Sequence, residues 1–66
     1  MDVLKLKGKR VEKGFTQETI AEKANMSAVS YCRKERGERE FLCSEISAIT
    51  IMLSLSPEEV YDIFLK

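Results

Sequence analysis

The side chains of this sequence that could do chemistry are basic and hydroxyl groups, and the usual catalytic groups are missing. There is no His among the 66 residues, which removes the commonest general base and the commonest metal ligand. The two Cys lack CxxC spacing and are expected to be reduced thiols. Glu58 and Glu59 follow Ser56-Pro57, where acidic residues favour a helix start rather than an acid–base pair. The sequence therefore predicts no enzyme, no metal, no cofactor and no small-molecule ligand.

The eleven basic and eleven acidic residues cancel over the whole chain but are sorted along it. Residues 1–39 hold ten basic residues against six acidic ones, a net charge of +4. Residues 40–66 hold one basic residue against five acidic ones, a net charge of −4. This sorting is typical of a protein that turns one face toward a polyanion. Charge alone leaves a mixed, solvated surface as the alternative.

The elements that must position these groups are marked by three helix starts. Each start places a Ser or Thr directly after an apolar residue, with another apolar residue four positions further on. The hydroxyl caps the first turn and the two apolar residues fix the entry angle of the chain. The three starts are Phe15-Thr16 with Ile20, Met26-Ser27 with Tyr31, and Leu55-Ser56 with Val60.

Five helices and no strand follow from these signals, because no segment sustains an alternation of apolar and polar residues. The chain, residues 1–66, is expected to form one all-α domain. The expected helices run from Val3 to Lys13, Gln17 to Ala24, Ala28 to Glu35, Ser44 to Leu53, and Pro57 to Phe64.

Only Asn25-Met26-Ser27 separates the second helix from the third. So short a turn forces a sharp crossing, and the second helix must be small where the third approaches. Ala21 and Ala24 meet this requirement. Asn25 is expected in the left-handed conformation, which Asn tolerates better than most residues. Tyr31 is expected to face inward, against the second helix.

Two stretches of this region together carry one sequence signature. Its most specific positions are Gln17, Ala21 and Glu35-x-Gly37. The two stretches read Thr16-Gln17-Glu18-Thr19-Ile20-Ala21-Glu22-Lys23-Ala24-Asn25-Met26-Ser27 and Lys34-Glu35-Arg36-Gly37. The sequence resembles the phage Cro and repressor family of helix-turn-helix DNA-binding domains from about Leu4 to Phe64. The resemblance implies a five-helix, lambda-repressor-like domain whose second and third helices form the helix-turn-helix.

Three positions depart from that family pattern. Asn25 stands where the turn usually has Gly, and Lys34 and Lys9 stand where apolar residues are usual. The stem of Lys34 is expected to cover apolar surface while its charge reaches water.

On DNA, the outward side of the third helix would meet base edges in the major groove. With Tyr31 inward, that outward set is Ala28, Val29, Cys32 and Arg33. Arg33 can grip guanine O6 and N7, whereas Ala28 and Val29 can pack on a thymine methyl group. The alternatives are a phosphate or solvated role for Arg33 and mere tolerance of small residues at the other two.

Phosphate contacts are expected to fix affinity and register without reading sequence. The expected residues are Gln17, Ser27, Ser30, Arg10, Arg36 and Arg39. The family resemblance implies that Gln17 contacts phosphate. It also implies that Arg10 forms a salt bridge with Glu35, which would aim Arg10 toward phosphate. Cys32 is expected to be a weakly polar filler, and Cys43 aligns with a core-facing position.

Apolar residues at the end of the chain exceed what its own core needs. Ile63, Phe64 and Leu65, with Ile51 or Met52, are expected to form a dimer surface. In relatives of this size such a surface makes a two-fold dimer, which places two recognition helices roughly 34 Å apart. A monomer with scattered apolar residues is the alternative.

The function favoured by this sequence is sequence-specific binding of duplex DNA by a Cro-like transcriptional repressor, acting as a homodimer on a palindromic operator. It is expected in the cytoplasm of a bacterial host, at the nucleoid. The stretch from Ile46 to Leu55 is too short and too polar to span a membrane, so no membrane partner is expected. The alternative is a protein-interaction module, antitoxin-like or anti-repressor, with DNA binding secondary. The neutral net charge favours that alternative slightly.

Overall fold

The computed structural model describes all 66 residues and contains helices but no strand. The prediction of an all-α chain with five helices is confirmed, and the fifth helix changes character along its length. Its final turns widen into a π-helical segment, η1, that continues α5 without a break. The elements are α1 (Val3–Glu12), α2 (Gln17–Lys23), α3 (Ala28–Glu35), α4 (Cys43–Met52), α5 (Pro57–Val60) and η1 (Tyr61–Leu65).

Side-chain caps begin four of the helices. The hydroxyls of Thr16, Ser27 and Ser56 each accept the backbone N–H three residues later at 3.1 Å, which confirms the three predicted caps. Asp2 caps α1 in the same way at 3.0 Å, which sequence reasoning missed. Each such cap typically contributes about 1 kcal/mol, so the helix boundaries are largely encoded locally.

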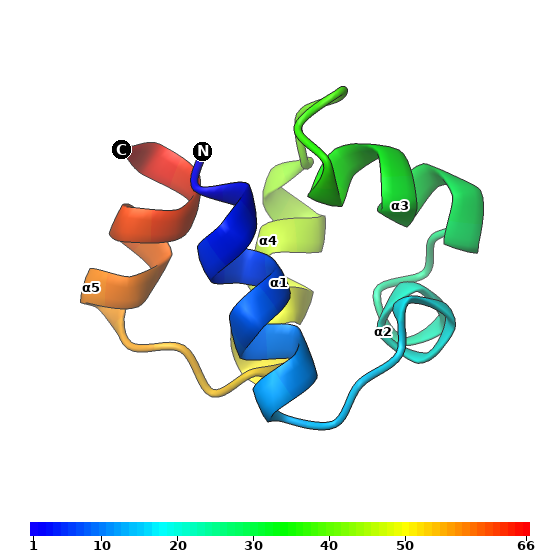
Figure 1. Ribbon diagram of the computed structural model, residues 1–66, viewed down its shortest axis with the longest axis horizontal. Helices are drawn as coiled ribbons and strands as arrows, with labels where there is room; N and C mark the ends of the chain where they lie inside the picture. The colour runs from blue at the N-terminus through cyan, green and yellow to red at the C-terminus, as the bar shows by residue number, and fades with distance from the viewer.

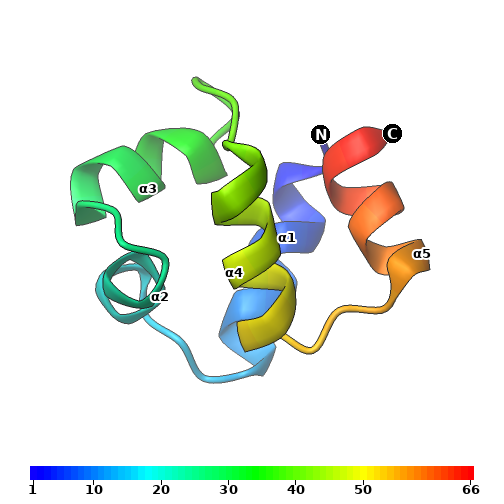
Figure 2. The ribbon, with the colours of Figure 1, turned by 180° about the vertical axis from the view of Figure 1, so that it is seen from behind.

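The α4 helix lies behind α1, between α5 and the α2–α3 pair (Figures 1 and 2). Figure 1 shows α1 in front, with α5 on one side and the α2–α3 pair on the other. Figure 2, seen from behind, shows α4 between these two groups. None of the helices has both the length and the apolarity that crossing a bilayer requires.

One apolar core joins all of these elements. Tyr31 is at its centre, completely buried, and its ring packs against Phe41 with centroids 5.7 Å apart. Phe15, Met26 and Val60, three of the apolar residues that flank the caps, pack against the edge of the core. The nine core residues are Leu6, Ile20, Ala21, Tyr31, Phe41, Ile49, Leu53, Leu55 and Ile63.

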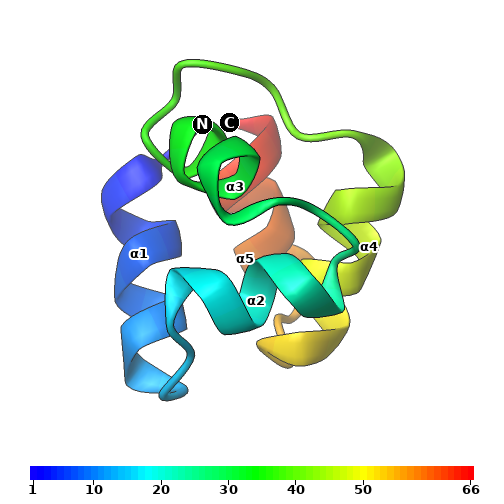
Figure 3. The same cartoon turned by 90° about the vertical axis from the view of Figure 1, so that its right-hand side faces the viewer.

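The turn between α2 and α3 has the geometry that its residues predict. Asn25 is left-handed, with φ of 60°. The Met26 N–H donates to the Ala21 carbonyl at 2.8 Å, which closes the turn against α2. Ala21 is completely buried and Ala24 is 8% exposed, so both small side chains lie where the two helices meet. Figure 3 looks at this side of the molecule and shows α3 above α2.

The two ends of the chain meet. The Asp2 N–H donates to the Ile63 carbonyl at 2.8 Å, and Lys5 pairs with Asp62 at 3.1 Å. Figure 1 shows the N- and C-termini side by side. The last turn of the chain is therefore hydrogen-bonded to the first.

A second ion pair joins α1 to the start of α5. Lys9 Nζ lies 2.6 Å from a Glu59 carboxylate oxygen, so this lysine pairs with a residue of another helix. The hydrogen bond from Lys9, with the backbone N–H of Ser56, lowers the pKa of Glu59 to about 2. The same hydrogen bond, with the charge of Glu12, raises the pKa of Lys9.

Candidate nucleic-acid interface

The two sides of α3 differ sharply in exposure. Tyr31 and Glu35, four residues apart, point into the molecule and are 0% and 4% exposed. Val29 is 64% exposed and Arg33 is also exposed, four residues further along the outer side. Of the other predicted base-reading residues, Ala28 is exposed and Cys32 is partly exposed. The outward set expected from the sequence is thus on the solvent side of α3.

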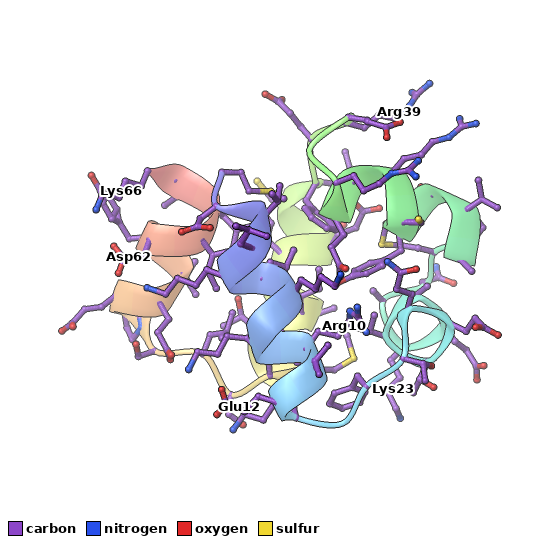
Figure 4. All side chains as sticks on the ribbon, in the orientation of Figure 1. Arg10, Glu12, Lys23, Arg39, Asp62 and Lys66 are labelled. Atoms are coloured by element: carbon purple, nitrogen blue, oxygen red, sulfur yellow. The ribbon has the colours of Figure 1, made fainter.

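A shallow basic hollow of about 320 Å³ lies along this outer side. Neither Arg33 nor Arg39 has a carboxylate within salt-bridge distance, so both guanidinium groups are free to bind an anion. Figure 4 shows Arg39 extending away from the body of the molecule, above α3. The hollow is lined by Ser27, Val29, Ser30, Arg33, Lys34 and Arg39.

The two predicted phosphate-binding serines, Ser27 and Ser30, both line the basic hollow but differ in exposure. The Ser27 oxygen accepts the Ser30 N–H, which leaves its hydroxyl proton available to an acceptor. Ser27 is exposed and Ser30 is half-buried, and both face the basic hollow. Their hydroxyl groups are therefore placed to donate to an oxyanion beside Arg33 and Arg39.

Arg10 is not at this surface, because its guanidinium is bonded inside the molecule. The predicted ion pair with Glu35 is present and bidentate, with Nε 2.8 Å from Oε2 and Nη2 3.2 Å from Oε1. Arg10 Nη1 donates to the Phe15 carbonyl at 2.7 Å, and the residue is 7% exposed. Figure 4 shows Arg10 reaching from α1 toward α2. The expectation that Arg10 contacts phosphate is therefore wrong. Arg10 instead holds α3 against α1 through its bonds to Glu35.

Glu35 is held ionised by the groups around it. Burial would raise its pKa, but the hydrogen bonds from Arg10 and Gln17, together with the Arg10 charge, hold the pKa of Glu35 below its ordinary value. The neighbouring Tyr31 hydroxyl is buried and has no hydrogen-bond partner. Burial, and then the nearby Glu35, raise the pKa of Tyr31, so its phenol stays neutral.

Gln17 shares this carboxylate rather than pointing freely outward. Its amide nitrogen donates to Glu35 Oε1 at 3.2 Å, and the side chain is half-buried. Gln17 also lines an open hollow of about 540 Å³, together with Lys7 and Arg36. The amide carries a second N–H, so contact with an anion in that hollow is compatible with its bond to Glu35.

Arg36 lies in an exposed ion pair with Glu38 at 2.8 Å, and both side chains are more than half exposed. Exposed pairs of this kind contribute little free energy, on the order of 0–1 kcal/mol. The Arg36 guanidinium can therefore exchange Glu38 for another anion at little cost.

Lys34 does not send its charge to water as expected. Its ammonium lies 2.7 Å from Glu45, and its side chain is only 12% exposed. The same Glu45 oxygen accepts the Leu42 N–H at 2.8 Å. Burial would raise the pKa of Glu45, but these two donors lower it further than burial raises it. The pair joins the end of α3 to the start of α4 and so anchors both ends of the loop that carries Arg39.

The predicted dimer residues fall into three different environments. Ile63 is completely buried in the core of its own chain, so its assignment to a dimer surface is wrong. Phe64 is half-buried and packs edge-on against Phe41, with centroids 5.6 Å apart. Leu65 is 67% exposed, as a contact residue must be, and Ile51 on α4 is 79% exposed. A hollow of about 510 Å³ beside Ile51 is lined mainly by α4 and α5.

Both cysteines are free thiols. Cys32 is partly exposed at the outer side of α3, whereas Cys43 is exposed at the first position of α4. The core-facing assignment of Cys43 is wrong, because Cys43 is on the solvent side of the first turn of α4, whereas Glu45 in the same turn is buried. No group of His, Cys, Asp or Glu side chains is arranged to hold a metal ion.

Comparison of the chain with protein-family models, with curated proteins and with solved structures finds no match.

Proposed function

We propose that this chain is a sequence-specific binder of duplex DNA, with α2 and α3 acting as a helix-turn-helix and α3 entering the major groove. The observation that carries the proposal is the asymmetry of α3. Its inner side is anchored by the buried Tyr31 and Glu35, and its outer side presents Val29 and Arg33. A helix held rigidly from behind, with a free Arg on its outer side, has the arrangement that base-edge recognition requires.

The residues around α3 divide by what they can bind. Arg33 is the one long donor on the outer side, and it fits guanine O6 and N7. The phosphate contacts come from the surrounding groups, which hold the helix in register. They are Arg39, Arg36, Gln17, Ser27 and Ser30, with Arg10 acting indirectly by positioning α3.

The proposal extends to a Cro-like repressor that binds a palindromic operator as a homodimer and acts at the nucleoid in the bacterial cytoplasm. Two copies related by a two-fold axis would place two α3 helices about one DNA turn apart, roughly 34 Å. The exposed Leu65 supports a contact between copies near the end of the chain.

A protein-interaction module is the second candidate, and a different surface favours it. Ile51 is 79% exposed beside the α4–α5 hollow, although most large apolar side chains of this chain are partly or fully buried. The Thr50 hydroxyl in this hollow donates to the Ile46 carbonyl at 2.7 Å, so it offers little polarity to water. An exposed apolar surface of this kind is typical of contacts with another protein.

Selection of bound sequences from random duplex DNA, followed by fluorescence anisotropy on the enriched duplex, tests the main proposal. We expect one enriched site and an affinity that falls steeply with added salt, because bound counterions are released. Arg33→Ala should relax the preference at one base pair, whereas Arg39→Gln should weaken all duplexes alike. The control is Lys66→Gln, which removes one unpaired charge from a side chain that Figure 4 places far from Arg39.

Two results would contradict the proposal. One is the absence of any enriched duplex, and the other is an Arg33→Ala variant that keeps the wild-type sequence preference. Sedimentation of the free protein with Leu65→Glu and with Ile51→Glu tests self-association separately. A dimer that only the Leu65 change disrupts supports the expected contact. Disruption by the Ile51 change assigns the α4–α5 hollow to that contact instead.

A further inference from the structure

The outer side of α3 is unusual in offering almost no hydrogen-bond acceptor to a base. Ala28 and Val29 have apolar side chains, Cys32 is a weak acceptor, and Arg33 only donates. The one carboxylate of the helix, Glu35, is buried and occupied by Arg10 and Gln17. This surface therefore cannot accept the amino protons by which cytosine N4 and adenine N6 are recognised.

Hydroxyl groups near this surface do not fill the gap. The Ser27 oxygen accepts the Ser30 N–H at 3.1 Å and keeps one lone pair, but Ser27 lies at the cap, before the first turn, and not on the outer side of the helix. Ser30 is half-buried beside the basic hollow, while Val29 is 64% exposed. The side chain that projects furthest from the first turn of α3 is thus a branched hydrocarbon.

A branched hydrocarbon can distinguish bases in the major groove by one feature, the group on carbon 5 of a pyrimidine. Thymine carries a methyl group there and cytosine carries hydrogen, and an apolar contact with that methyl group excludes water from both surfaces. The oxygen or amino group on the neighbouring carbon 4 makes no hydrogen bond with Val29. A thymine and a 5-methylcytosine therefore present the same feature to this side chain.

We infer that Val29, supported by Ala28, makes this protein a reader of pyrimidine 5-methyl groups, so that 5-methylcytosine replaces thymine at the position facing Val29. This inference rests on the proposed DNA binding and names what part of the site reads. Methylation of a cytosine at that position strengthens binding, and loss of the thymine methyl group weakens it. Burial of one apolar carbon group changes an equilibrium constant about fourfold, which sets the expected size of each effect.

The test compares duplexes that differ by single methyl groups. The enriched duplex is remade with deoxyuridine in place of each thymine in turn. At the sensitive position, the adenine–thymine pair is replaced by a guanine–cytosine pair. One duplex carries cytosine and the other carries 5-methylcytosine in place of the thymine. Dissociation constants are measured by fluorescence anisotropy at one salt concentration. We expect about a fourfold loss from thymine to deoxyuridine and about a fourfold gain from cytosine to 5-methylcytosine.

Variants of the protein assign the effect to Val29. Val29→Ala should reduce the methyl dependence at that position, because the shorter side chain buries less of the methyl group, and should leave the Arg33-dependent preference in place. Val11→Ala is the matched control, because Val11 is 59% exposed on α1 and Val29 is 64% exposed on α3. The control variant should keep the full methyl dependence.

The outcomes separate this inference from the proposed function. If no duplex is bound in preference to others, both fail. If a duplex is selected but deoxyuridine equals thymine at every position, only the methyl inference fails. It also fails if cytosine and 5-methylcytosine bind equally, or if the dependence is undiminished in Val29→Ala.

Discussion

Replacing Glu35 by Gln is expected to destabilise the protein severely, because Arg10 would keep its buried charge without a counter-ion. The Glu35 carboxylate accepts two hydrogen bonds from Arg10 and one from Gln17, at 2.8, 3.2 and 3.2 Å. These three residues belong to α1, α2 and α3. One carboxylate thus holds together the three helices behind the proposed DNA-binding surface.

The size of the effect follows from the burial of the pair, whose side chains are 9% and 4% exposed. Removing one partner of a buried ion pair typically costs about 3–5 kcal/mol. The Gln amide still accepts one hydrogen bond, so we expect the lower end, about 3 kcal/mol. A domain of 66 residues has a total unfolding free energy of about 3–10 kcal/mol. The variant should therefore retain at most about 7 kcal/mol, and almost none if the wild type is at the lower end of that range.

Urea denaturation followed by far-ultraviolet circular dichroism measures this loss. The control is Glu38→Gln, which breaks the exposed pair with Arg36 and should cost under about 1 kcal/mol. The folded-state pKa of Glu35 is lowered, so its contribution is fully present above pH 4.5 and is lost as pH falls through the folded value. The difference in unfolding free energy between wild type and Glu35→Gln should accordingly become smaller as the pH is lowered below 4.5. Equal costs for the two variants, or a gap that stays constant with pH, would refute the reasoning.

Four further changes test other parts of the fold. Glu59, with a pKa lowered from 4.5 to about 2, contributes stability that is lost as pH falls through that range, so Glu59→Gln should flatten the pH dependence of thermal unfolding between those values. Gly8→Ala should raise stability by about 1 kcal/mol in a thermal melt, because a Cβ there meets no atom within 4 Å. Gly37→Ala should lower stability by about 1–2 kcal/mol, since φ is +83° and the new Cβ would lie 3.2 Å from Val3; a neutral result would contradict the strain. Ser54→Gly should stabilise by about 0.5 kcal/mol, because Ser54 has φ of 52°, and a lower urea midpoint would be the contrary result.

The local features of the fold were predictable because they depend on residues close together in the chain. The Thr16, Ser27 and Ser56 caps each involve atoms within three residues, and the Asn25 turn involves a single φ angle. The bounds of α3 match the prediction at both ends, and those of α1, α2 and α4 differ by one residue at one or both ends. The widening of α5 into η1 had no sequence signal.

The long-range pairings were less predictable because they depend on how the helices pack. A lysine at an apolar position predicts only that its stem is covered, and the sequence did not reveal Glu45 as the partner of Lys34 or Glu59 as that of Lys9. The same limit explains Ile63. The sequence indicated that Ile63 is on an apolar side of its helix. Only the packing of the chain end against α1 shows that residues of the same chain cover this side.

The hydrogen bond between the Asp2 N–H and the Ile63 carbonyl has a practical consequence for engineering. Because residues 1 and 66 approach within 3.4 Å at their backbones, a short Gly-Ser linker would join them into a ring without displacing a helix. Cyclisation would lower the conformational entropy of the unfolded chain and leave the folded state almost unchanged. The free energy of unfolding would therefore rise. By the same geometry, bulky tags placed at both ends would crowd one another on the same edge of the molecule.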